Sequence, residues 1–223
     1  MAAEPAGAPT QLRTGLGRDS AFSFRCHACN RCCRHKTIQV NPYELARLSR
    51  GLGLPVAEVV ERYTDGGVHL RQREDGNCVF LGPAGCSVHG DRPLVCRLYP
   101  LGRIVGPDSE EFVDAAPHPE TEGAWGTDGT IADYLEQQDA LPYMELADAY
   151  FGLFLKLLQD PDGAAAIQPH EMIDIDAALG EAEEEPQTTI EARAHRHVRL
   201  LAARAAGIEQ PVAYPPVIKP PLR

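Results

Sequence analysis

The sequence predicts a mainly α-helical fold with a small β-hairpin: a compact, irregular, metal-centred domain with C-terminal helices packed on it. Three observations carry this prediction. Apolar residues recur at helical spacing in several segments, most of them in the second half of the chain. One stretch, "VHLRQREDGNCVFL", alternates apolar and polar residues around a turn-forming centre. All seven cysteines fall between Cys26 and Cys96, so the metal centre is expected in the first half.

Two helices are expected shortly after the first cysteines. "NPYELARLSRGLG" begins the first, because Asn41 suits the N-cap and Glu44 completes a capping box. A glycine at position 51 or 53 would end it. Apolar residues at helical spacing predict a second, shorter helix over residues 55–63.

The alternating stretch is expected to fold as a β-hairpin of residues 68–73 and 78–81, with "EDGN" supplying the turn. "DRPLVCRLYP" starts like a helix near Asp91 and must stop by Pro100. "GRIV" and "EFVDA" are expected to pair as two short strands.

The second half is expected to be helical. One helix starts at Thr130, and "PYMELADAYFGLFLKLLQD" is the longest amphipathic run. Its apolar stripe is expected to be core and consists of Leu146, Tyr150, Leu153 and Leu157.

A further helix is expected to begin near Thr188 or Thr189 and to end at Gly207. It carries His195 and His197 two residues apart, so the two rings point to different helix faces and cannot share a metal. Both histidines are expected to be solvated.

These elements suggest four regions. A flexible leader is expected over residues 1–20, a cysteine-cluster metal-binding domain over 21–140, a helical extension packed on it over 141–207, and a Pro-rich tail over 208–223. The N-terminus has no apolar core of the kind that a signal peptide requires, and the most apolar run is too short to cross a bilayer. A cytoplasmic protein is therefore expected.

The net charge of −11 is unevenly distributed. Residues 1–105 carry 14 basic and 9 acidic side chains, whereas residues 106–223 carry 7 and 23. Nucleic-acid binding favours a continuous basic face, and here the positive charge lies beside the cysteines. No nucleic-acid or membrane partner is expected, and the sequence identifies neither a redox or protein partner nor an oligomeric state.

The cysteines follow the spacing Cys26-x2-Cys29-x2-Cys32-Cys33, and then Cys78-x7-Cys86-x9-Cys96. An odd count without an export signal argues against a disulfide framework. Two residues between thiols let a tight loop present both sulfurs to one centre, which suits tetrahedral zinc. The same run suits three corners of a [4Fe–4S] cluster. A catalytic Cys–His pair is the weaker alternative, since such an enzyme needs one activated thiol and not seven.

Basic residues flank these cysteines and would lower the thiol pKa values and offset the charge of a thiolate-ligated centre. They are Arg25, Arg31, Arg34, Lys36, Arg92 and Arg97.

"CHACNRCC" followed by "CVFLGPAGCSVHGDRPLVCRLYP" resembles the bacterial CxxCxxCC zinc- or iron-chelating (YkgJ-like) family of cysteine-cluster proteins, over about residues 24–140. His89 replaces the aromatic residue that is usual in that pattern. Many relatives carry a further cysteine before the "GTIADYL" segment, where this chain has His118. Histidine can replace cysteine as a ligand of zinc or of an iron–sulfur centre.

The resemblance implies metal binding through a set of ligands comprising Cys26, Cys29, Cys32, Cys33, Cys78, Cys86, Cys96 and His118. Arg92 and Arg97 would support the site from outside the ligand set, and Pro93 and Pro100 would fix the loop around Cys96. An iron–sulfur cluster with a redox or group-transfer supporting role is preferred, because seven thiols exceed what one zinc needs. A zinc-stabilised, non-catalytic binding or adaptor module is the alternative. The family includes the bacterial flagellin lysine N-methylase, so methyl transfer to protein lysines is a second alternative, and whether the protein is an enzyme stays open.

Overall fold

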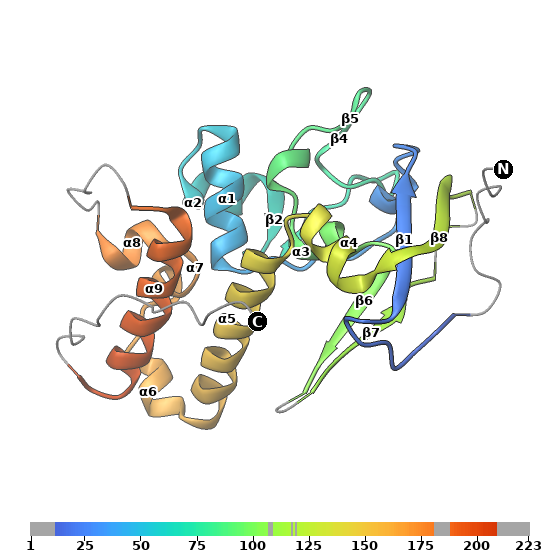
Figure 1. Cartoon of the computed structure of the whole chain (residues 1–223). Coiled ribbons are helices and arrows are strands. Elements are labelled where there is room, and N and C mark those ends of the chain that lie inside the picture. The colour runs from blue at the N-terminus through green and yellow to red at the C-terminus, as the bar shows by residue number, and fades with distance from the viewer. Residues whose placement is uncertain (1–11, 107–108, 117, 119, 181–187, 209–223) are drawn as a thin grey trace, which may run out of the picture.

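The computed structural model describes residues 12–106, 109–116, 118, 120–180 and 188–208. Figure 1 shows helices α1, α2 and α5–α9 gathered on one side, the β1–β8 and β6–β7 strand pairs on the other, and α3 and α4 between them. The helices are α1 Pro42–Leu52, α2 Val56–Tyr63, α3 Leu94–Leu98, α4 Ile131–Gln137, α5 Leu141–Gln159, α6 Pro161–Ala165, α7 Pro169–Ile173, α8 Ile175–Leu179 and α9 Ile190–Ala205. Two single 3₁₀ turns are η1 Arg31–Cys33 and η2 His89–Asp91.

The strands form short antiparallel pairs, and within the described ranges none of the pairs closes into a larger sheet. The pairs are β1 Ala21–Cys26 with β8 Gly123–Thr130, β2 Thr64–Asp65 with β3 His69–Leu70, β4 Leu81–Gly82 with β5 Gly85–Cys86, and β6 Leu101–Val105 with β7 Glu110–Asp114. The pairing of "GRIV" with "EFVDA" is confirmed as β6 with β7.

The predicted starts of α1, α4 and α9 are confirmed, whereas the start expected near Asp91 is wrong, because residues 89–91 form the 3₁₀ turn η2 and α3 begins at Leu94 after Pro93. At the start of α1, the Asn41 side chain accepts a hydrogen bond from the Glu44 N–H, and Glu44 accepts one from the Asn41 N–H. Thr130 and Asp133 make the same reciprocal pair before α4, and Thr189 caps α9. Capping residues satisfy helix N–H groups that have no partner inside the helix, so these starts depend on local sequence.

The predicted hairpin of residues 68–73 and 78–81 forms only next to its turn. Gly76 N–H donates to Arg73 O within the "EDGN" turn, Val79 N–H donates to Arg71 O, and Gln72 and Cys78 form an antiparallel bridge, but the outer parts of the two arms do not pair with each other. The arms pair instead with other neighbours, as β3 with β2 and β4 with β5.

The fold is more mixed than the predicted helical fold with one hairpin. About half of it is helical, and the β1–β8 pair was missed entirely. These two strands lie about a hundred residues apart in sequence, and β8 has the sequence "GAWGTDGT", whose glycines are typical of loops. The Phe24 ring packs against the Trp125 ring across this pair, at a tilted angle and with 4.8 Å between the ring centroids.

The second half of the predicted leader is packed against β7. Arg13 donates to the Asp114 carboxylate at 2.8 Å, Leu16 bridges Phe112, and Arg18 pairs with Glu110. Residues 1–11 lie outside the described part of the chain. So do residues 181–187 and 209–223, which include most of the Pro-rich tail.

Two of the three apolar cores among the described residues position the cysteine-rich segments. One joins the cysteine half to the C-terminal helices and includes Phe22, Tyr43, Leu98, Phe112, Ile131, Leu146 and Ala194. The other lies under α1 and α2 and includes Ile38, Leu45, Val59, Leu70 and Phe80. Cys78, Cys86 and Cys96 pack against this second core, so the cysteines are held by a close-packed wall.

The predicted stripe of α5 is buried as expected, whereas the prediction of a solvated His197 is wrong. The His197 ring is fully buried between α5 and α7. Its Nε2 lies 2.7 Å from the Glu171 carbonyl oxygen, which can only accept, so Nε2–H donates and Nδ1 accepts from the Tyr150 hydroxyl at 2.9 Å. Both ring nitrogens are therefore satisfied in the neutral imidazole. His195 is partly exposed beside Glu145, as its position on another face of α9 predicts.

Stability should depend on the charge of His197. Burial lowers the pKa of His197 in the folded protein, while the unfolded chain has the ordinary value of about 6.5. Its neutral form therefore contributes stability that is fully present above about pH 6.5 and is lost as the pH falls below that value. Urea unfolding of the wild type and of His197→Gln at about pH 8 and about pH 5 measures this, and the stability difference between them should shrink at the lower pH. His195→Ala serves as the control, and an identical pH slope for wild type and His197→Gln would contradict the assignment.

In the part of the chain that the structure describes, no helix has both the length and the apolar composition needed to cross a lipid bilayer.

Candidate metal centre

Six of the seven cysteines face one cavity of about 430 Å³. They come from three stretches of the chain that the fold brings together, and they are Cys26, Cys32, Cys33, Cys78, Cys86 and Cys96. Apolar and aromatic side chains fill the wall between the thiols, among them Phe24, Ile38, Leu70, Phe80, Tyr99 and Tyr134. The result is a sulfur-rich cavity with a mostly apolar lining.

The first cysteines are delivered by the end of strand β1. The chain leaves β1 at Cys26 and turns sharply, because Ala28 and Asn30 both adopt left-handed backbone angles with φ of 55° and 61°. The Ala28 N–H donates to the Cys26 sulfur at 3.3 Å. A left-handed alanine is strained, so this loop stores conformational energy beside the candidate site.

Cys32 and Cys33 lie on the turn η1 with their sulfurs 4.0 Å apart. The hydrogen bond from Cys33 lowers the pKa of Cys32 to about 7, and the charges of Arg92 and Lys36 act in the same direction. The same hydrogen bond raises the pKa of Cys33, and burial raises it further. Of this pair, Cys32 is therefore the thiol that ionises more readily near neutral pH.

The other three cavity cysteines come from the β4–β5 region and from α3. Cys78 precedes β4, where its N–H donates to Cys33 O at 2.8 Å, and this bond ties the two cysteine segments together. Cys86 ends β5, and Cys96 lies in the middle of α3. Burial raises the pKa of Cys78, Cys86 and Cys96, and the charges of neighbouring thiols raise it further. A bound cation reverses this effect, because a thiol that ligates a metal loses its proton.

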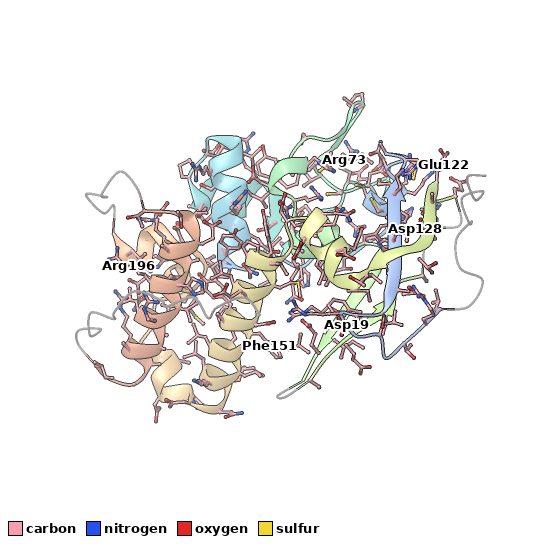
Figure 2. All side chains as sticks on the ribbon, viewed as in Figure 1. Asp19, Arg73, Glu122, Asp128, Phe151 and Arg196 are labelled. Atoms are coloured by element: carbon pink, nitrogen blue, oxygen red, sulfur yellow. The ribbon has the colours of Figure 1, made fainter. Side chains whose placement is uncertain are left out.

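Cys29 lies outside the cavity. Its sulfur accepts a hydrogen bond from the Glu122 N–H at 3.3 Å and also lies 3.6 Å from Glu122 O. Figure 2 shows Glu122 beside the end of β1 that leads into the cysteine loop. In this arrangement Cys29 fastens the cysteine loop to the start of β8, whereas the sequence places it among the ligands.

His118 lies four residues before Glu122, in the segment that leads into β8. It is not among the residues that line the cavity. Its Nδ1 accepts a hydrogen bond from the Glu120 N–H at 3.1 Å, so the ring proton is on Nε2. A metal on Nδ1 would displace this hydrogen bond. A metal on Nε2 would move the ring proton to Nδ1, which could then no longer accept it. Its assignment as an eighth ligand stays a prediction.

The two arginines expected to support the site differ in position. Arg92 lines the cavity and is anchored by His89 O at 2.7 Å and by the Gln138 side chain at 2.9 Å. The Arg97 side chain is buried behind the wall, where it donates to the carbonyl oxygens of Gly90, Arg92 and Gln138 and to the Tyr143 hydroxyl. Arg92 can thus contact a bound centre directly, whereas Arg97 holds the backbone at Gly90 and Arg92.

Among the described residues, no three Cys, His, Asp or Glu side chains converge closely enough to hold one metal ion without rearrangement. Tetrahedral zinc with Zn–S bonds of about 2.3 Å would need sulfurs about 3.8 Å apart. The 4.0 Å between Cys32 and Cys33 approaches that value. The donor set itself, six thiols without a competing carboxylate in the cavity wall, suits soft metals and iron–sulfur centres.

Sequence reasoning missed several residues that shape the site. Tyr134 and Gln138 reach the cavity from α4, some forty residues beyond the last cysteine. Glu44 was identified only as part of a capping box, but it also contacts the backbone at the start of α3. No local signal points to these contacts, because they join segments far apart in sequence.

Comparison with known proteins agrees with the cysteine pattern. Residues 25–118 match the model of the CxxCxxCC family, described as a "putative zinc- or iron-chelating domain". The match ends earlier than the region of about 24–140 expected from the motifs. The chain is also 31% identical over 86 residues to an uncharacterized protein of Methanocaldococcus jannaschii. That alignment covers 36% of this chain and 46% of the relative, so the chain spans about half of that protein's length. No solved structure matches the chain.

Proposed function

Because residues 25–118 match the model of a zinc- or iron-chelating domain, we propose that the chain binds an iron–sulfur centre in its thiol-lined cavity. The observation that carries the proposal is the convergence of six cysteines from three stretches of the chain on one cavity. Reduced structural thiols are normally dispersed through a core and do not line a common space.

The charge of the cavity wall supports a thiolate-ligated centre. Lys36 and Arg92 both line the cavity, and neither has a carboxylate within 4 Å among the described residues. Four thiolates around a dication, whether zinc or an oxidised [4Fe–4S] core, leave a net charge of about −2. Two uncompensated cations in the wall would neutralise that charge.

The size of the cavity favours a cluster over a single ion. A volume of about 430 Å³ far exceeds the space that one zinc ion occupies between four converging sulfurs. Six thiols also exceed the four that one such ion takes. A cluster has several metal atoms and inorganic sulfides, so it can fill a wide cavity while its thiolate ligands stay apart.

In this proposal the cavity residues bind and shield the centre. The six thiols would supply the ligands, and Lys36 and Arg92 would supply the compensating charge. The apolar wall would limit the access of water to the cluster, and this exposure to water is one of the factors that set its reduction potential. When bound, such a centre supplies electron transfer or supports a group-transfer reaction. The lysine N-methylase activity implied by the resemblance gains no support from the cavity residues and is not proposed.

A zinc-stabilised binding module is the second candidate, and one observation favours it. The Cys32 and Cys33 sulfurs are 4.0 Å apart, close to the spacing in a tetrahedral zinc site. In that case the thiols would be structural, and removal of the metal by a chelator would unfold the domain.

The test is to purify the protein without oxygen and to measure iron, sulfide and zinc together with the visible spectrum. A cluster predicts about four irons per chain and broad visible absorbance that dithionite bleaches. A colourless protein with one or two zinc ions per chain would refute the cluster and support the zinc-stabilised module. Protein that binds neither metal, also after anaerobic reconstitution with iron and sulfide, would refute both proposals.

A further inference from the structure

Glu44 is a buried carboxylate at the start of α1, and its side chain joins two separate parts of the fold. The residue is 3% exposed. One oxygen, Oε2, accepts from the Asn41 N–H at 2.8 Å and completes the capping box of its own helix. The other oxygen, Oε1, accepts from the Leu94 N–H at 2.6 Å, fifty residues further along the chain.

Capping does not explain this burial. The equivalent box at α4 uses Asp133, which hydrogen-bonds only within its own box, to the Thr130 N–H and hydroxyl, and faces solvent. A carboxylate in water caps a helix as well, whereas burial penalises its charge. Burial raises the pKa of Glu44 to about 7, although the two N–H donors and Arg97 oppose the shift. The buried position therefore has a use beyond α1.

The second oxygen reaches the helix that carries Cys96. Helix α3 has five residues, too few to be stable without external contacts. The Glu44 carboxylate accepts the first N–H of α3, and the Arg97 guanidinium holds the carbonyl oxygens of Gly90 and Arg92 just before it. Cys96 lies two residues after Leu94 and faces the cavity.

We propose that Glu44 is a positioning residue for the metal centre: its carboxylate fixes the first turn of α3 and thereby aims the Cys96 thiol into the cavity. This inference rests on the proposed function for its metal, but the restraint on α3 exists without one. Groups that orient a ligand typically change metal affinity about 10- to 100-fold when they are removed.

The first experiment titrates Zn²⁺ into reduced, metal-free protein in competition with a chelator. Glu44→Gln keeps the shape of the side chain but replaces one acceptor oxygen with a donor, so one of the two N–H groups loses its partner. Its zinc affinity should fall about 10- to 100-fold. Asp133→Asn makes the same change in the exposed capping box and should leave the affinity unchanged.

A double-mutant cycle with Cys96→Ser separates positioning from general destabilisation. If Glu44 acts through Cys96, adding Glu44→Gln to Cys96→Ser should cause no further loss of zinc affinity. An equal loss in both backgrounds would overturn the proposal, and so would an unchanged affinity in Glu44→Gln alone.

Hydrogen exchange on the metal-free protein tests the restraint independently of any metal. The amides of α3 should exchange faster in Glu44→Gln than in wild type, and at the wild-type rate in Asp133→Asn. Unchanged exchange would overturn the inference even where metal binding holds, whereas a wild type that binds no metal would refute the proposed function alone. If Glu44→Gln does not fold, Glu44→Asp serves instead, because its shorter carboxylate cannot span both N–H groups.

Discussion

Cys96→Ser should lose most of its bound metal, with affinity reduced by at least about 100-fold, because a ligand contributes more than the groups that orient it. Cys96 lines the cavity from the middle of α3, where burial and the charges of Cys78, Cys32 and Cys86 raise the pKa of its thiol. Metal analysis after anaerobic reconstitution measures the loss.

Cys29→Ser is the matched control for this prediction. It makes the same change in the same motif, but the Cys29 sulfur bonds the Glu122 backbone and lies outside the cavity. We expect it to keep its metal. Equal loss of metal in the two variants would show that Cys29 is also a ligand and that the ligands are not confined to the cavity cysteines. Full metal content in Cys96→Ser would refute the proposed site.

Arg97→Met should be strongly destabilising. The Arg97 side chain is buried, its guanidinium lies 4.1 Å from the Tyr143 ring centroid, and it donates to three carbonyl oxygens and a hydroxyl. Methionine fills much of the space but donates nothing, so the three carbonyl oxygens and the Tyr143 hydroxyl lose this donor. Breaking a buried charged network of this kind costs about 3–5 kcal/mol, which lowers Tm by roughly 10 °C in a chain of this size.

Thermal unfolding followed by circular dichroism checks the Arg97 prediction. Arg62→Ala is the control, since Arg62 makes an exposed ion pair with Glu58 one helical turn away, and it should leave Tm unchanged. Equal melting of Arg97→Met and wild type would mean that the carbonyl oxygens of Gly90, Arg92 and Gln138 find other donors.

The starts of α1, α4 and α9 were predictable because each depends on a few neighbouring residues. Asn41 and Glu44, or Thr130 and Asp133, are three residues apart, and their mutual hydrogen bonds form wherever a helix begins there. The α5 stripe was predictable for a similar reason, since helical geometry alone places Leu146, Tyr150, Leu153 and Leu157 on one face.

The strand pairs were harder to predict. The turn at Gly76 is local and forms, but the partners of the strands that flank it are chosen by burial against distant segments. The β1–β8 pair joins residues about a hundred positions apart, and no pattern within either strand names the other. His197 is a related case: its position on α9 was correct, but its burial depends on α5 and α7 packing on either side of the ring.

By itself, the sequence determined the capped starts of α1, α4 and α9, the apolar face of α5 and the cysteine motif, because these follow from chemistry within a few residues. The tertiary structure alone decided which thiols share a cavity, that the Cys29 sulfur bonds the Glu122 backbone, and that Glu44 reaches Leu94. The reason is physical: spacing limits where neighbouring thiols can point, but the convergence of segments far apart in the sequence is selected by the packing of the whole core.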